Sequence, residues 1–283
     1  MTNTIKNAIF SSFVADAYTL GAHWVYDEEQ LKNLPINWET LNAPQAMWHK
    51  GKTKGDFTHY GDQTLFLLEY LSQNKSFDKQ QYYTFWNSKM QNYQGYIDGA
   101  TRNALENINS ECTDLNICSR ITPLLLISSS KKDFLEHTKA LTQMTHNSPL
   151  ALQTSQFFAE LLWDTKENQK LKENINTLKE NYPLLTKWID EALATKENDT
   201  FTTIRGFSPA CDIDGGFSGV IHLLSLEDDF KTIMTKNAKA GGDSSARGMV
   251  VAMLLGIDDN FELPLEWVDA MNKKIKIDTY LEK

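Results

Sequence analysis

Apolar residues recur at the spacing of an α-helix along most of this chain, and the alternation typical of strands is scarce. In residues 5–20, apolar side chains follow one another at four-residue intervals, which places them on one helix face. The chain has only 7 prolines and 14 glycines, so long helices are possible. The stretches 64–71, 150–163 and 248–256 are more apolar than a surface helix requires. We predict that they form buried helices.

Two further segments complete the secondary-structure prediction. Residues 166–197 are rich in Lys, Glu and Asn, as solvated helix faces are, and Pro183 predicts a break into two helices. The best strand signal is the short stretch 201–207. No linker, low-complexity tract or internal repeat is evident. We therefore predict a single, mostly α-helical domain over residues 1–283.

The charge balance limits the partners of this chain. Its 37 acidic and 28 basic residues give a net charge of −9, which argues against nucleic acid and anionic membranes as partners. No stretch approaches the roughly 20 apolar residues of a membrane span. The first apolar run is interrupted by Asp16, so it does not resemble an export signal. We expect a cytoplasmic protein, and its oligomeric state is left open.

The cysteines predict no covalent framework. Three cysteines are an odd number, and they include no C-x-x-C pair, so neither a disulfide framework nor a zinc site is expected. Cys112, Cys118 and Cys211 are interpreted as core or loop thiols.

Three glycine-containing segments stand apart from the helical background: YGDQT at 60–64, YIDGATR at 96–102 and AGGDSSARG at 240–248. The first and third place Asp62 and Asp243 just before strongly apolar stretches. Asp is a favoured helix N-cap, and a helix N-terminus attracts anions. We expect both helices to begin at these residues and to point into one shared cavity.

These segments, with others, resemble the ADP-ribosylglycohydrolase family. The opening IKNAIFSSFVADAYTLGAHWVYD is similar to the family's first helix and its G-D-A-L-G-type turn. YGDQT resembles Y-T-D-D-T, and AGGDSSARGMVVAMLLG resembles the closing G-G-D-T-D-T motif. SRITPLL at 119–125 and THNSPLALQTSQFFA at 145–159 match two further segments in the right order. The resemblance extends from about residue 5 to 257.

The resemblance implies an all-α, single-domain orthogonal helical bundle. It also implies hydrolysis of a glycosidic bond in ADP-ribose conjugates or a related ribosyl nucleotide, so that the partner is a small molecule or an ADP-ribosylated substrate. Two Mg²⁺ or Mn²⁺ ions, held by carboxylates, serve this chemistry in the family. No redox cofactor is indicated, because no G-x-G-x-x-G follows a strand.

This chain departs from the family at the metal-binding positions. In the first motif Gly61 replaces Thr, Asp62 is kept and Gln63 replaces the second Asp. In the last motif Asp243 is kept, while Ser245 and Ala246 replace Asp and Thr. His23 falls on the position of the family Glu.

Of five expected carboxylates, two remain, which is too few to offset two neighbouring dications. The resemblance therefore implies at most one Mg²⁺ or Mn²⁺, bound by Asp62, Asp243 and Ser245. The altered motifs resemble a divergent branch of the family that includes the J1 crystallins and selenoprotein J.

The candidate site residues follow from these matches. Asp62, Asp243 and His23 are the catalytic candidates, because carboxylates and an imidazole suit proton transfer. Arg247, alone or with His23, is the candidate for replacing the metal's positive charge near the two carboxylates; the alternative is a plain salt bridge between helix starts. The substrate-binding candidates are Gly61, Gln63, Gly242, Ser244, Arg247, Asp98 and Arg102.

Other residues keep two interpretations. His146 is interpreted as a buried, hydrogen-bonded structural histidine, and the alternative is a general acid or base; His59 could line a cleft. Asp114, like Asp98, could restore a missing carboxylate. The aromatic residues near the matched segments either fill the core or stack on an adenine; they are Trp24, Tyr26, Tyr93 and Tyr96.

The sequence is compatible with three functions. The first is a metal-assisted glycosidic hydrolase. The second is a non-catalytic member of the fold that binds a nucleotide or has a structural, crystallin-like role. The third is a metal-independent hydrolase that uses Arg247 and His23.

Overall fold

The computed structural model describes residues 3–283, and in this range the chain is helical with no β-strand. An isolated β-bridge joins Asp114 to Asp212. The α-helices are α1 Asn3–Thr19, α2 Glu28–Lys32, α3 His59–Asn74, α4 Lys79–Met90, α5 Gly99–Leu105, α6 Lys131–Thr142, α7 Pro149–Asn168, α8 Leu171–Leu178, α9 Thr186–Leu193, α10 Thr200–Phe207, α11 Ile213–Ser225, α12 Phe230–Lys239, α13 Ser244–Leu255, α14 Leu265–Asp269 and α15 Lys274–Glu282. Short 3₁₀-helices are η1 Met47–His49, η2 Leu115–Arg120, η3 Thr122–Leu126 and η4 Lys179–Asn181.

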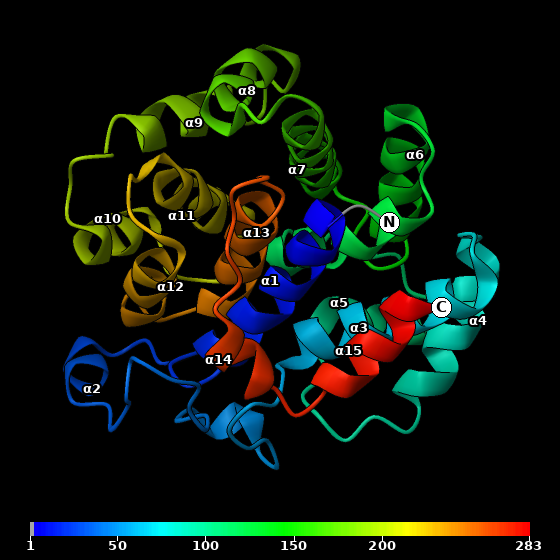
Figure 1. The fold of residues 1–283 in the computed structure, drawn as a ribbon, viewed down its shortest axis with the longest axis horizontal. Helices are drawn as coiled ribbons and strands as arrows, with labels where there is room; N and C mark the ends of the chain where they lie inside the picture. The colour runs from blue at the N-terminus through cyan, green and yellow to red at the C-terminus, as the bar shows by residue number, and fades with distance from the viewer. Residues whose placement is uncertain (1–2) are drawn as a thin grey trace.

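The core is organised around α1 and α13, which pack against each other more extensively than any other pair of elements in residues 3–283. Figure 1 shows both helices near the centre, with α3, α7, α11 and α12 around them. Both are buried along most of their length, which explains why their sequences are apolar on more than one face. Ser11 Oγ donates to the Ala252 carbonyl at 2.8 Å and ties the two helices together.

The all-α prediction is confirmed, and the predicted helices correspond to α1, α3, α7 and α13, with α1 and α13 ending one residue earlier than predicted. The break at Pro183 is also confirmed, because α8 ends at Leu178 and α9 begins at Thr186. No helix among the described residues is long and apolar enough to cross a membrane.

The strand predicted for 201–207 is wrong, because these residues form α10. The aromatic and β-branched residues in this stretch favour strands, but local capping and packing override that preference. Asp199 accepts a hydrogen bond from Thr202 N at 2.8 Å and caps the helix. Ile204 is fully buried, and α10 packs against α11.

Of the two predicted helix starts, one is confirmed. Asp243 is the N-cap of α13 and accepts from Ala246 N at 3.2 Å. The prediction for Asp62 is wrong, because α3 already begins at His59. Its N-cap is Thr58, whose Oγ1 accepts a hydrogen bond from Tyr60 N at 3.1 Å. Asp62 therefore lies inside the first turn of α3, where its carboxylate still benefits from the helix dipole.

Candidate functional site

The candidate site lies where the C-terminal end of α1 meets the first turns of α3 and α13. Two hydrogen bonds from Thr58 hold the carboxylate of Asp16 in α1: Thr58 N donates at 2.8 Å and Thr58 Oγ1 at 2.7 Å. Thr19 Oγ1 lies 2.8 Å from Ser245 Oγ, and so joins α1 to α13. Tyr60 Oη donates to Asp243 Oδ2 at 3.2 Å, and so joins α3 to α13. The motifs that the sequence singled out are thus brought together.

Gly61 allows α3 to approach the Asp16 carboxylate. A Cβ at this position would lie 2.2 Å from Asp16 Oδ2 and 2.9 Å from Phe57 Cβ, which is closer than real contacts permit. Burial raises the pKa of Asp16 to about 7, although the Thr58 hydrogen bonds act in the opposite direction. The close packing of α3 against Asp16 and Phe57 therefore explains why this position is glycine, without any contact with substrate.

Asp243 and His23 form a buried pair beneath this junction. His23 Nδ1 lies 3.6 Å from Asp243 Oδ1 and accepts a hydrogen bond from Ser245 N at 3.3 Å. Because Nδ1 accepts, the neutral ring carries its proton on Nε2. Burial lowers the pKa of His23 well below its usual value, and burial raises the pKa of Asp243 to about 6. Near neutral pH the carboxyl is thus within reach of protonation, as a general acid or base requires.

Asp62 is neutralised by two lysines. The ammonium groups of Lys52 and Lys273 contact opposite oxygens of its carboxylate, and Tyr93 Oη donates to Oδ2 at 2.8 Å. The Asp62 side chain is only 4% exposed, whereas those of Lys52 and Lys273 are 14% and 26% exposed. Lys273 reaches the site because α15, which follows it, packs against α3 (Figure 1). The carboxylate is therefore fully engaged by groups of this chain.

Gln63 is also fully engaged. Its Oε1 accepts from Trp86 Nε1 and from Arg120 Nη1, both at 2.9 Å, and its Nε2 donates to Thr101 Oγ1 at 3.2 Å. Asp98 caps α5 by accepting from Thr101 N at 2.7 Å. These bonds make Gln63 and Asp98 part of the buried framework that joins α3, α5 and η2.

Arg247 does not bridge the two carboxylates. Its guanidinium donates to Gly241 O at 2.6 Å, to Asn237 Oδ1 at 3.1 Å and to Pro209 O at 3.2 Å. Among residues 3–283, no hydrogen bond or ion pair joins the guanidinium to Asp62 or Asp243. The predicted bridge between the two carboxylates is therefore wrong, because two backbone carbonyls and Asn237 hold the guanidinium, although its positive charge still acts to lower the pKa of Asp243, which burial raises.

The remaining substrate-binding candidates lie in a tight turn, in the buried core and on the surface. Gly242 has a φ of 60°, and a Cβ there would lie 2.0 Å from Pro209 O, so the turn before α13 requires glycine. Ser244 is fully buried, and its Oγ has no hydrogen-bond partner among the described residues. Arg102 is exposed on α5 and donates to Ile97 O at 2.7 Å.

An aromatic cluster covers the His23 side of the junction. The indole of Trp24 stacks on His23 and His49, at centroid distances of 4.8 and 5.1 Å, and meets Tyr96 edge-on at 4.7 Å. Trp24 has a φ of 62°, which is strained for a residue other than glycine. Trp24 N donates a hydrogen bond to Gly242 O at 2.8 Å, and this bond holds the conformation.

The donor atoms at the family's metal positions do not fit a Mg²⁺ or Mn²⁺ ion. Such an ion needs about six oxygen ligands. Both oxygens of Asp62 already contact ammonium groups, and Gln63 Oε1 already accepts two hydrogen bonds. Ser245 Oγ is hydrogen-bonded to Thr19 Oγ1. Asp243 caps α13 and accepts from Tyr60. A metal would have to displace these partners one by one.

The sequence did not identify Lys52, Lys273 or Asp16 as parts of this site. Lys52 lies between matched motifs and Lys273 lies beyond the last one, so neither belongs to a recognisable pattern. A weak signal for Asp16 was available, since a charged residue in an otherwise apolar helix needs a buried partner.

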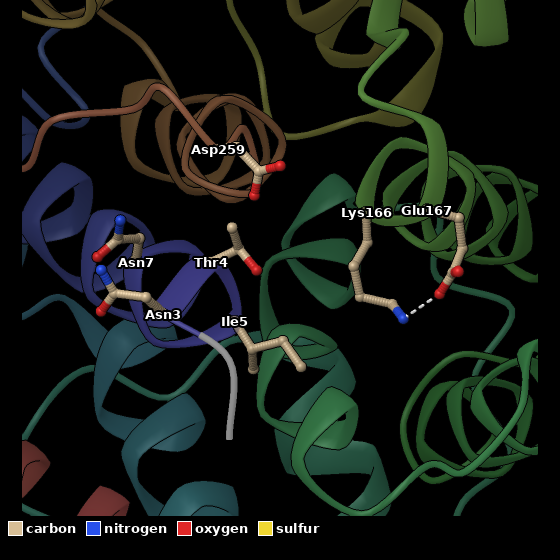
Figure 2. A pocket seen from close by; sticks show the side chains of 7 residues that line it. All are labelled: Asn3, Thr4, Ile5, Asn7, Lys166, Glu167 and Asp259. Carbon is tan, nitrogen blue, oxygen red and sulfur yellow. Dashed lines mark hydrogen bonds and ion pairs between the residues drawn. The ribbon is translucent and has the colours of Figure 1, made fainter.

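A separate pocket of about 390 Å³ lies at the other end of α1 (Figure 2). Along the helix axis, Asn7 is about 14 Å from Asp16, at 1.5 Å per residue. The pocket contains none of the predicted site residues. It is lined by Asn3, Thr4, Ile5, Asn7, Lys166, Glu167 and Asp259.

Comparisons with known proteins agree with this architecture. The sequence profile described as ADP-ribosylglycohydrolase matches residues 2–283. Crystallin J1A of Tripedalia cystophora is 24% identical over 309 aligned positions, which cover 98% of this chain and 95% of that crystallin. Crystallin J1B of the same organism is 26% identical, with coverages of 93% and 90%. A solved structure described as an ADP-ribosylglycohydrolase-related protein complex has a TM-score of 0.72 at 20% identity, covering 98% of this chain and 95% of that one.

Proposed function

Because this chain belongs to the ADP-ribosylglycohydrolase family, we propose that it is a divergent member without the family's Mg²⁺-dependent hydrolysis, and that its role is structural, like that of the crystallins it resembles. The observation that carries this proposal is the neutralisation of Asp62 by Lys52 and Lys273. Two ammonium groups supply the positive charge that dications supply in the family, but they offer no Lewis acid.

Burial of the junction supports the same proposal. Asp62, Asp243 and His23 are between 0% and 3% exposed, and Trp24 lies against His23. A sugar ring could contact His23 only if the indole of Trp24 moved, and Asp62 only if Lys52, Lys273 or Tyr93 moved. A fold does not by itself determine a reaction, so the burial of these groups and the pairing of Asp62 with two lysines support the proposal.

A second candidate is a metal-independent hydrolase of a ribosyl nucleotide. The pKa of Asp243, raised to about 6 by burial, favours it, because a carboxyl that titrates near neutral pH beside His23 is suited to proton transfer. In that role Asp243 would act as the acid or base, and Asp62 would remain an anchor for the two lysines.

The test is a calorimetric titration of ADP-ribose into the protein, with Mg²⁺ and then with EDTA, followed by hydrolysis assays on ADP-ribosylated protein. The structural proposal predicts no release of ADP-ribose in either buffer and no metal-dependent binding. Hydrolysis in EDTA that is lost in Asp243→Asn would establish the second candidate. Hydrolysis that requires Mg²⁺ would overturn both.

A further inference from the structure

A second cluster of chemically active side chains lies on the connections around η2. Cys112 and Asp114 belong to the loop between α5 and η2, and His146 belongs to the connection between α6 and α7. One potential ligand atom from each of the three lies within 4.8 Å of the other two. No hydrogen bond or ion pair among residues 3–283 joins these three side chains to Asp62 or Asp243, although burial and the charge of Asp114 both raise the pKa of Asp243.

The side chains of this cluster make few hydrogen bonds to the rest of the described chain. His146 is fully buried, and its Nε2 has no hydrogen-bond partner among residues 3–283. Asp114 is the N-cap of η2, yet its side chain makes no capping hydrogen bond. The thiol of Cys112 is free of any disulfide. An unpartnered buried imidazole beside a thiol and a carboxylate indicates a missing ligand.

The backbone holds both connections in place around the cluster. Asn147 N donates to Ser110 O at 2.8 Å, and Ser148 Oγ donates to Cys112 O at 3.2 Å, so the loop is joined to the chain next to His146. On its other side, Leu115 N donates to Cys211 O, and Ile213 N donates to Thr113 O, both at 2.8 Å. The loop that carries Cys112 and Asp114 is therefore anchored from two directions before any ligand binds.

We propose that Cys112, Asp114 and His146 bind one zinc ion, with water as the fourth ligand. Thiolate and imidazole are ligands that zinc accepts and magnesium does not favour. One thiolate and one carboxylate balance the charge of the ion. Zinc ligands lie about 2.0–2.3 Å from the metal, so the cluster needs only a small contraction to coordinate it.

The surroundings orient the ligands as known zinc sites do. Thr145 Oγ1 lies 2.8 Å from His146 Nδ1 and fixes the imidazole ring, which leaves Nε2 for the metal. Cys112 and Asp114 are half-buried, so the fourth position can reach solvent. Binding releases the thiol proton of Cys112, because the thiolate is the ligand. This proposal does not depend on the proposed function.

The test uses the full chain without an affinity tag, stripped with a chelator and dialysed against Zn²⁺ alone. We expect one zinc per chain, a higher melting temperature with Zn²⁺ but not with Mg²⁺, and a thiolate-to-metal charge-transfer band when Co²⁺ replaces Zn²⁺. Cys112→Ser should lose the band and weaken zinc binding at least tenfold, and Asp114→Asn should weaken it while keeping the band.

Cys211→Ser is the matched control. Cys211 is also half-buried, and its carbonyl accepts a hydrogen bond from Leu115 N at the end of the same loop, but its thiol is not one of the proposed ligands. It should keep both the band and the stoichiometry. Both key variants replace half-buried loop residues, so folding can be checked by circular dichroism before zinc is added. The proposal is overturned if the parent binds no stoichiometric zinc, or if Cys112→Ser retains the cobalt band.

Discussion

At the residue scale, the surroundings of Asp62 are the basis of our proposal that this chain lacks metal-dependent hydrolysis. Two lysines from distant parts of the chain meet one buried carboxylate, and Tyr93 adds a hydrogen bond. Removing one partner from a buried ion pair leaves an uncompensated charge, which costs more than the pair itself contributes. The stability of this region should therefore depend on both lysines.

The double variant Lys52→Met/Lys273→Met tests this dependence. It leaves Asp62 buried and unpaired, so we expect the free energy of unfolding to fall by about 3–5 kcal/mol in urea titrations. Mn²⁺ should restore part of this loss, because Asp62 becomes available to a cation. Lys89→Met, which breaks the more exposed pair with Glu69, is the control and should cost under about 1 kcal/mol. Equal losses in the two variants would contradict the argument.

Gly61→Ala tests the close approach of α3 to Asp16. The added Cβ would meet Asp16 Oδ2 at 2.2 Å, so we expect a loss of about 1–3 kcal/mol in the free energy of unfolding. Gly99→Ala is the matched control, because an added Cβ in α5 meets no atom within 4 Å. That variant should be neutral or slightly stabilising. The steric explanation fails if both variants melt at the same temperature.

At the element scale, the helices that the sequence predicted are those in which apolar spacing and burial agree. Helices α1 and α13 are of this kind, and the N-cap role of Asp243 followed from its position before an apolar stretch. Helix α10 was missed because its capping by Asp199 outweighs its strand-favouring residues. The Lys273 contact could not be predicted, because 211 positions separate it from Asp62 and only the packing of α15 on α3 brings them together.

The start of α13 offers a prediction at this scale. Asp243→Asn keeps an oxygen for Ala246 N, so we expect little loss of stability at pH 7, where the buried carboxyl of the parent is costly to ionise. Asp243→Ala removes the cap and should lower the free energy of unfolding by about 1–2 kcal/mol. Urea unfolding at pH 7 measures both. Losses of the same size in the Asn and Ala variants would contradict this expectation, because they would show that stability depends on the charge of Asp243 and not on its capping oxygen.

At the scale of the whole molecule, buried groups couple the fold to pH in opposite directions. Burial raises the pKa of Asp16 from 3.8 to about 7. Between these pH values the carboxyl stays protonated in the folded chain but ionises in the unfolded chain, so the fold loses stability as pH rises. Burial, with the charges of His59 and Lys52, lowers the pKa of His49 to about 3. His49 thus stays neutral in the folded chain while it gains a proton in the unfolded chain below about pH 6.5. That proton stabilises the unfolded state, so acid weakens the fold through His49.

His49→Gln isolates this contribution, because Asp16 is common to both proteins. At pH 8 the imidazole is neutral in both states, and the difference in unfolding free energy there gives the packing cost of the substitution. As pH falls from 6.5 to 5, the variant should gain about 1.6 kcal/mol in total relative to the parent, and the slope approaches about 1.4 kcal/mol per pH unit only at the acid end of this range. Urea titrations at several pH values measure this difference. If it stays constant over that range, His49 takes up its proton as readily in the folded chain as in the unfolded one, and burial among Trp24 and His23 does not govern its charge.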